Sequence, residues 1–271
     1  MMRKNRIALY CQEDHPKFHE SKLIANDLDI SLIISNEVLE NKYDYILFWE
    51  FNLNNYYLSI RSYTDKLSKS LNVDYVNNII AGKKCYKFSY NDVLPKAMGL
   101  SKLKDKKINI LDATAGFTLD SYALLELNKN IHITLLENSK VLFFLLKDGL
   151  ERLSLGSESS IDISKRVTLL NINFIDYIQS QTAESNFDII YLDPMFEKDK
   201  ASAKPKQNMQ LLQDICVNPN TVKELLEAAL NYKNKTKIVL KRNIKQPKLL
   251  EKNINYSVSS KQIRYDVYIN Q

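Results

Sequence analysis

The chain has little glycine, proline and cysteine. With 5 Gly and 6 Pro in 271 residues, the sequence argues against flexible linkers, low-complexity tracts and extended disorder. The three cysteines, Cys11, Cys85 and Cys216, are widely spaced and form no CxxC pair. We therefore expect neither a zinc site nor a disulfide framework, and a reducing cytoplasm is the expected environment.

Histidine and long apolar runs are scarce too. The three histidines, His15, His19 and His132, provide no visible metal site, so no metal is expected. The apolar run before Gln12 is only about five residues long, too short for a signal peptide. No uncharged apolar run is long enough to cross a bilayer, so we expect a cytoplasmic protein with no membrane partner.

What the chain does contain is enough apolar sequence for a core and a modest positive charge. Hydrophobic residues make up 45%, which is normal for a globular protein. The net charge is +6 and the pI is near 8.9. This balance fits a polyanionic partner but indicates it only weakly.

From about residue 105, strand-like and helix-like blocks alternate. Strands are predicted at 108–111, 131–136, 167–172, 187–192 and 237–240, and helices at 119–127, 141–155 and 221–232. This order requires right-handed parallel crossovers, hence a doubly wound α/β sheet. The strand-like segments 256–260 and 265–269 have no full helix between them, so they predict an antiparallel strand at the end of that sheet.

The first eighty residues follow another pattern. They predict strands at 7–11 and 30–34, a helix at 17–28, and a hairpin of 43–51 and 56–60 around residues 52–55. We expect a small N-terminal α+β domain, residues 1–82, followed by the α/β domain, residues 83–271.

The first α/β strand ends in the small residues of Asp112–Gly116, which read DATAG. Such a turn lets the backbone pass close to a ligand and present N–H groups at the start of a helix. It would suit the amino-acid end of S-adenosylmethionine (SAM), with Asp112 or Asp120 accepting hydrogen bonds from the ammonium. Glu137, at the end of the second strand, is placed to bind both ribose hydroxyls.

Two further residues follow the third strand. There Asn173 would bond the adenine edge and Phe174 would stack on the ring, although core packing of Phe174 is equally compatible with the pattern. NAD is the competing cofactor, but Gly116 is the only glycine of the turn and GxGxxG is missing.

Residues 188–196 read DIIYLDPMF, an apolar strand that enters an Asp-Pro-x-aromatic turn. The Asp193 carboxylate and the Pro194 carbonyl would bind the two N–H groups of an exocyclic base amine. Those bonds bias the nitrogen towards tetrahedral geometry and aim its lone pair at the sulfonium methyl. Phe196 would stack on the base, so catalysis would depend mainly on positioning.

At these motifs the chain resembles the RsmJ type of bacterial ribosomal RNA methyltransferases, which methylate the N2 amine of a guanine in small-subunit rRNA. The resemblance rests on DATAG with Asp120 and on LDPMF (Leu192–Phe196), and matching segments extend over roughly residues 83–269. It implies a Rossmann-like class I SAM methyltransferase sheet, mostly parallel with an antiparallel C-terminal strand. It also implies SAM as cofactor and small-subunit (16S) rRNA or a ribosomal particle as partner.

The cofactor residues that the motifs and the resemblance together indicate are Asp112, Ala115, Gly116, Leu119, Asp120, Glu137, Asn138, Asn173, Phe174 and Asp193. The chain departs from the family in four places. Gly-Phe-Thr-Leu replaces a turn with a second glycine and an arginine, Asn138 replaces arginine, Asn173-Phe174 replace two serines, and the glycine-rich stretch after the Lys87-Phe88 match is absent. Backbone contacts survive such changes, so SAM binding is still expected.

Candidate phosphate contacts surround the Asp-Pro turn and the neighbouring strand ends. They are Lys198, Lys204, Lys206, Lys241, Arg242 and Arg264. Other functions stay open: a DNA adenine or cytosine amino-methyltransferase, a protein or small-molecule methyltransferase, a non-catalytic SAM-binding or RNA-binding module, and an NAD enzyme.

Overall fold

The computed structural model describes residues 6–35, 42–65, 69–180, 186–194, 211, 214–215 and 219–270. The chain divides into two compact units, each of which is assembled from separate stretches of sequence. Unit 1 comprises Met1–Lys84, Ser139–Ser157 and Lys198–Val217, and unit 2 comprises Cys85–Asn138, Glu158–Glu197 and Asn218–Gln271.

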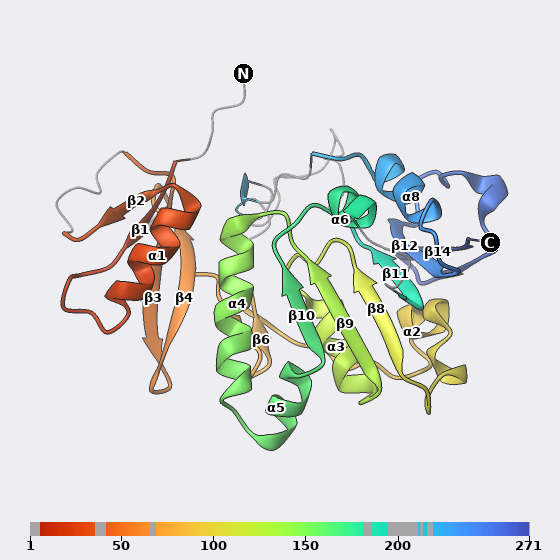
Figure 1. Ribbon diagram of the computed structural model, residues 1–271, viewed down its shortest axis with the longest axis horizontal. Coiled ribbons are helices and arrows are strands. Elements are labelled where there is room, and N and C mark those ends of the chain that lie inside the picture. The colour runs from red at the N-terminus through yellow and green to blue at the C-terminus, as the bar shows by residue number, and fades with distance from the viewer. Residues whose placement is uncertain are drawn as a thin grey trace. The chain divides into compact units, whose positions relative to one another are not determined.

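Unit 2 contains a sheet of strand order β10-β9-β8-β11-β12-β14-β13. Its strands are β8 (Ile108–Asp112), β9 (Ile131–Leu136), β10 (Val167–Leu170), β11 (Ile189–Leu192), β12 (Lys237–Asn243), β13 (Tyr256–Ser259) and β14 (Ile263–Ile269). The strands from β10 to β12 are parallel, whereas β14 pairs antiparallel with both β12 and β13. This confirms the predicted class I sheet with its antiparallel C-terminal strand, and Figure 1 shows β10, β9 and β8 side by side.

The apolar strands are buried because helices cover the sheet. All four residues of β11 are buried, as expected for a central parallel strand covered on both faces. The helices of unit 2 are α2 (Val93–Met98), α3 (Leu119–Leu127), α5 (Glu158–Ser164), α6 (Phe174–Ser180) and α8 (Val222–Leu230). Leu225 and Leu226 of α8 pack with Leu192 and Leu240 in one core cluster. Of these helices, α2, α5 and α6 were not predicted from the sequence.

Unit 1 contains a sheet of order β2-β1-β3-β4, with β1 (Ile7–Tyr10) parallel to both neighbours and β3 antiparallel to β4. The other elements are α1 (Phe18–Leu28), β2 (Ser31–Ile33), β3 (Tyr45–Asn52), β4 (Asn55–Ser62), β5 (Val73–Asp74), β6 (Ile79–Ile80) and β7 (Lys83–Lys84). The predicted strands, helix and hairpin of this region are confirmed. The hairpin turn is shorter than predicted, because Leu53 and Asn54 alone make it, at φ 47° and 61°.

Helix α4 (Lys140–Ser154) follows β9 in the chain but belongs to unit 1. On α4, Asp148 Oδ2 accepts the Leu58 amide of β4 at 3.1 Å and the Arg152 guanidinium at 2.6 Å. The same guanidinium donates to the Val73 carbonyl of β5 at 2.6 Å and lies over the Tyr57 ring. The grouping of residues 139–157 with the N-terminal strands differs from the predicted division at 82/83, and that division stays a prediction.

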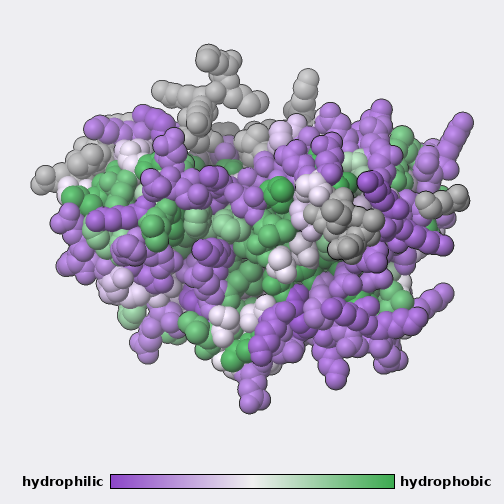
Figure 2. All heavy atoms as spheres, in the orientation of Figure 1, coloured by the Kyte–Doolittle hydropathy of each residue, from purple (hydrophilic) through white to green (hydrophobic). Residues whose placement is uncertain are grey.

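The surface seen in Figure 2 is mainly hydrophilic, with apolar residues visible in patches between long polar side chains. No helix in the described part of the chain is long and apolar enough to cross a membrane.

Candidate functional site

The turn after β8 is held in place by its neighbours in the sheet. The Ala113 amide donates to the Tyr191 carbonyl of β11, and the Ala115 amide donates to the Leu136 carbonyl of β9, both at 3.0 Å. Gly116 and Thr118 have φ of 52° and 56°, so the backbone turns through the left-handed region twice before α3 begins. Glycine suits the first of these positions, whereas Thr118 adopts a conformation that β-branched residues rarely take.

Asp112 lies at the end of β8 with its side chain buried. Its carboxylate accepts the Ser121 hydroxyl of α3 at 2.5 Å and the Thr114 amide at 3.2 Å. Burial raises the pKa of Asp112 to about 6, although both hydrogen bonds oppose the shift. The carboxylate therefore braces the turn against α3 from inside the protein.

Glu137 follows β9 and is also buried. Its Oε2 accepts the Gly116 amide at 3.1 Å, and its backbone carbonyl accepts the Asn171 side-chain amide at 2.7 Å. The carboxylate thus lies against the DATAG turn. A carboxylate accepts several hydrogen bonds, so the contact with Gly116 is compatible with a further bond to a diol.

Asp193 follows β11 and lies next to two other charged groups. Lys241 Nζ, on β12, is 2.8 Å from Asp193 Oδ2 and 2.9 Å from Asp120 Oδ2 of α3. The Asp193 amide donates to the Thr114 hydroxyl at 2.7 Å, which ties the Asp-Pro turn to the DATAG turn. The structure therefore brings Asp112, Asp120 and Asp193 to one end of the sheet.

Burial sets the electrostatics of this group of charges. It raises the pKa of Asp193 above its usual value, while Lys241 opposes the shift and Asp120 adds to it. Burial also lowers the pKa of Lys241, but the two carboxylates more than offset that effect and raise it overall. The ammonium is consequently charged at neutral pH.

Tyrosines complete the surroundings of Asp120. Asp120 Oδ2 accepts the Tyr191 hydroxyl of β11 at 2.5 Å, and Oδ1 accepts the Tyr86 hydroxyl. Burial, followed by the nearby carboxylates, raises the pKa of Tyr191 and of Tyr265, so both side chains are neutral donors at neutral pH.

The predicted adenine residues lie at the start of α6. Asn173 Oδ1 accepts the Ile175 amide at 2.8 Å, and its side-chain amide donates to Asn220 at 2.7 Å. Phe174 is 2% exposed and packs in the core cluster, so of its two open roles this arrangement favours core packing. Leu119 begins α3, and Asn138 is exposed beside Glu137.

The predicted phosphate contacts are not brought together among the described residues. Phe196, Lys198, Lys204 and Lys206 lie outside those residues. Lys241 is committed to the carboxylates, and Arg242 is buried.

Arg264 is buried as well, and its guanidinium donates to Asp266 and to the carbonyls of Ile244 and Gln246. In this structure Arg264 therefore braces the C-terminal strands instead of presenting its charge to solvent.

Sequence reasoning missed Thr114, Tyr191 and Tyr86 as site residues and gave Lys241 another role. Tyr191 precedes Leu192-Asp193 in the strand, and Tyr86 lies in a segment that matches the RsmJ type, so a signal was present for both. The Thr114 hydroxyl was visible in DATAG, but its partner 79 residues away was not.

The comparisons agree with this geometry. The family model described as "Putative SAM-dependent methyltransferase" matches residues 36–270. The chain is 30% identical to the ribosomal RNA small subunit methyltransferase J of Psychromonas ingrahamii, over 92% of this chain and 96% of the relative. The chain belongs to this methyltransferase family.

Two further similarities support the assignment. The protein of the same name from Francisella tularensis subsp. holarctica is 32% identical, over 87% of this chain and 98% of its own length. The crystal structure of a SAM-dependent methyltransferase from Neisseria gonorrhoeae has a TM-score of 0.64 at 20% identity, covers 97% of this chain and 95% of its own, and bears on the fold.

SAM is the cofactor of the family, and the chemistry of the site fits it. The ribose hydroxyls and the ammonium of SAM are hydrogen-bond donors, and carboxylates are supplied by Asp112 at the end of β8, Glu137 after β9 and Asp120 on α3. The methionine carboxylate needs N–H donors, which the backbone at the start of α3 supplies. Bound there, SAM supplies an electrophilic sulfonium methyl group.

Proposed function

We propose that the protein transfers the methyl group of SAM to the exocyclic N2 amine of a guanine in small-subunit (16S) rRNA. The observation that carries the proposal is the Asp193-Pro194 turn at the end of β11, with its carboxylate beside Lys241 and Asp120. The names of the relatives from Psychromonas ingrahamii and Francisella tularensis support an rRNA substrate.

An exocyclic amine is a poor nucleophile because its lone pair is delocalised into the ring. One Asp193 oxygen, Oδ2, holds Lys241, and no residue in the described part of the chain bonds Oδ1. Oδ1 would accept one amine N–H and the Pro194 carbonyl the other, so that the lone pair points towards the methyl group. Phe196 would stack on the base after it has left its helix.

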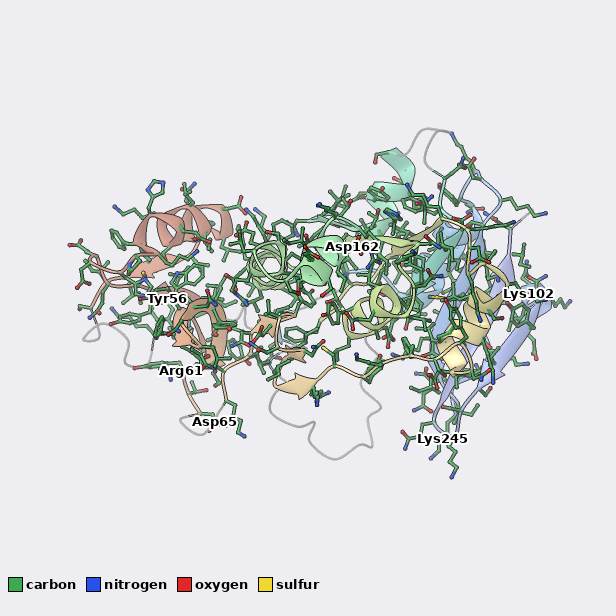
Figure 3. All side chains as sticks on the ribbon, turned by 90° about the horizontal axis from the view of Figure 1, so that it is seen from below. Tyr56, Arg61, Asp65, Lys102, Asp162 and Lys245 are labelled. Atoms are coloured by element: carbon green, nitrogen blue, oxygen red, sulfur yellow. The ribbon has the colours of Figure 1, made fainter. Side chains whose placement is uncertain are left out.

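Binding of the RNA phosphates requires positively charged side chains around the Asp193-Pro194 turn. Lys198, Lys204 and Lys206, which follow Asp193 in the sequence, remain the proposed phosphate contacts. Lys245, exposed on the turn after β12, extends away from the ribbon in Figure 3 and would add to them. Binding through such contacts weakens steeply with salt, because counterions return to the phosphates. A ribosomal substrate also places the activity in the cytoplasm.

The test supplies labelled SAM with small ribosomal subunits, free 16S rRNA or duplex DNA, followed by digestion to nucleosides. Label in N2-methylguanosine is the expected result, and the better of the two RNA substrates identifies the natural form. Label in methyladenine or methylcytosine of DNA would instead make the protein a DNA amino-methyltransferase.

The proposal predicts that Asp193→Ala lowers the methylation rate about 10²-fold under saturating SAM, the scale for losing one polar group that stabilises a transition state. SAM affinity should fall as well, since the carboxylate lies near the cofactor residues. Near-ultraviolet circular dichroism checks that the variant is folded. A folded variant with the wild-type rate would contradict a catalytic role for Asp193.

A further inference from the structure

Lys241 lies between the carboxylates of two different elements. Its ammonium contacts Asp120 Oδ2 on α3 and Asp193 Oδ2 after β11, and its side chain is only 16% exposed. The sheet register explains this position: Leu240 pairs with Leu192 of β11, so the next residue on each strand emerges at the same end of the sheet.

This arrangement disfavours the phosphate contact that the basic side chain at first indicates. An ammonium has three N–H donors, and two of them are already used by carboxylates. Two carboxylates around one ammonium leave a net negative charge, which would repel a phosphate at close range.

The same contacts fix Asp193. Without a cation, the carboxylates of Asp120 and Asp193 would face each other in a half-buried site and favour a proton on one of them. The other titratable side chains around them are Asp112 on β8, Tyr191 on β11, Tyr265 on β14, and Tyr86. Tyr191 and Tyr265 are neutral and Asp112 is an acid, so Lys241 supplies the positive charge among these described groups.

We infer that Lys241 is a positioning residue for methyl transfer: its ammonium holds Asp193 in one orientation and keeps the carboxylate ionised, leaving Oδ1 for the acceptor amine. The inference rests on the proposed function, because it assigns Lys241 a task in that reaction. It makes the bridge from Asp120 through Lys241 to Asp193 one unit that connects the cofactor helix to the Asp-Pro turn.

The experiment compares wild type with Lys241→Met, Lys241→Arg and the surface control Lys223→Met, which removes one exposed lysine of α8. The first measurement is the pH dependence of the methylation rate under saturating SAM. The acidic limb should move up by about one pH unit or more in Lys241→Met, the scale for losing an adjacent opposite charge. It should stay in place in Lys241→Arg and in the control.

The second measurement is the salt dependence of RNA binding without SAM. A positioning role leaves the slope of log K against log salt unchanged in Lys241→Met. A phosphate contact lowers the magnitude of that slope by about 0.7–0.9 and leaves the acidic limb where it was. That pair of results would overturn the inference.

A third measurement separates this inference from the proposed function. The melting-temperature deficit of Lys241→Met should grow from pH 5 to pH 8, as Asp193 ionises without its cation, and Asp193→Asn in the same chain should remove the growth. If the wild type methylates no RNA, the proposed function is overturned. The pH trend of the melting temperature then still tests the role of Lys241. A deficit that is constant with pH would overturn the inference. Lys241→Gln replaces Lys241→Met if the latter does not fold.

Discussion

At the scale of single residues, Glu137 has two tasks that one carboxylate performs together. It accepts the Gly116 amide at 3.1 Å, which shapes the turn, and it is the residue that we propose for the ribose of SAM. We expect Glu137→Gln to weaken SAM binding by about 1–3 kcal/mol, the scale for losing charge-assisted hydrogen bonds. Isothermal titration calorimetry measures the affinity.

The matched control is Glu126→Gln, which removes an exposed carboxylate from α3 and should leave SAM affinity unchanged. Equal affinities for wild type and Glu137→Gln would remove Glu137 from the cofactor site.

Asp112 makes stability depend on pH. Its pKa in the folded protein is raised to about 6 by burial, whereas an unfolded aspartate ionises near pH 4. Its contribution to stability is therefore full below about pH 4 and is lost as pH rises through about 6. Relative to wild type, Asp112→Asn should gain about 1.4 kcal/mol in unfolding free energy between pH 5 and pH 8.

Urea unfolding at the two pH values measures this change. Asp105→Asn, at an exposed turn position, serves as the control that should follow the wild-type pH dependence. If the curves for Asp112→Asn and wild type stayed parallel, Asp112 would not be a buried carboxyl of raised pKa.

The residue types of the site were readable from the sequence, but their pairings were only partly so. Asp112, Glu137 and Asp193 were each predicted from a motif at the end of an apolar strand, and the carboxyl ends of parallel strands meet at one edge of the sheet. The contacts of Lys241 were not predictable, since they depend on the register between β11 and β12 and on which side chain of α3 faces these strands. Arg264 was predicted as a phosphate contact but is buried, because a sequence does not show which charged side chains the fold buries.

At the scale of elements, α4 approaches β5 so closely that one of its positions must lack a side chain. A Cβ at Gly149 would lie 2.7 Å from Val73 Cγ1 and 2.9 Å from the Val73 carbonyl oxygen. Helix propensity favours alanine over glycine by about 1 kcal/mol, but overpacking against a backbone atom costs about 1–3 kcal/mol. Gly149→Ala should therefore lower the unfolding free energy despite the better helix former.

Chemical denaturation measures that change. Lys147→Ala on the exposed side of α4 is the control, and its effect should be small. A stabilised Gly149→Ala would mean that α4 and β5 are not held at this separation.

Long periodic elements were predictable, and short ones were not. Helices α4 and α8 carry enough apolar positions to show their period, whereas α3 and the parallel strands were recognisable as apolar runs of suitable length. By contrast, α6 has seven residues and β5 to β7 have two each, so tertiary contacts determine them. The location of α4 in unit 1 was also not predictable, because periodicity shows that a helix has an apolar face but not which strands pack against that face.

At the scale of the whole molecule, the predicted boundary at 82/83 would separate α4 from its partners. A protein that begins at residue 83 lacks β4 and β5, against which Asp148, Arg152 and Gly149 pack. The buried Asp148–Arg152 pair and part of an apolar face would then be exposed to solvent. We expect such a protein to aggregate or to unfold without a cooperative thermal transition.

Differential scanning calorimetry of the 83–271 fragment, with the full chain as control, measures this expectation. A cooperative transition together with SAM affinity equal to that of the full chain would show that α4 does not need the N-terminal strands.

The interleaving of the two units also has a consequence for the order of events on the ribosome. Because α4 ends at Ser154, the N-terminal strands emerge long before the helix that covers part of them has been synthesised. At about 5–20 residues per second, the roughly ninety residues between β4 and the end of α4 take several seconds to translate. During that interval the core of the nascent N-terminal segment is incomplete, because α4 has not yet been synthesised. We therefore expect the segment to depend on the cell's folding factors more than an autonomous first domain would.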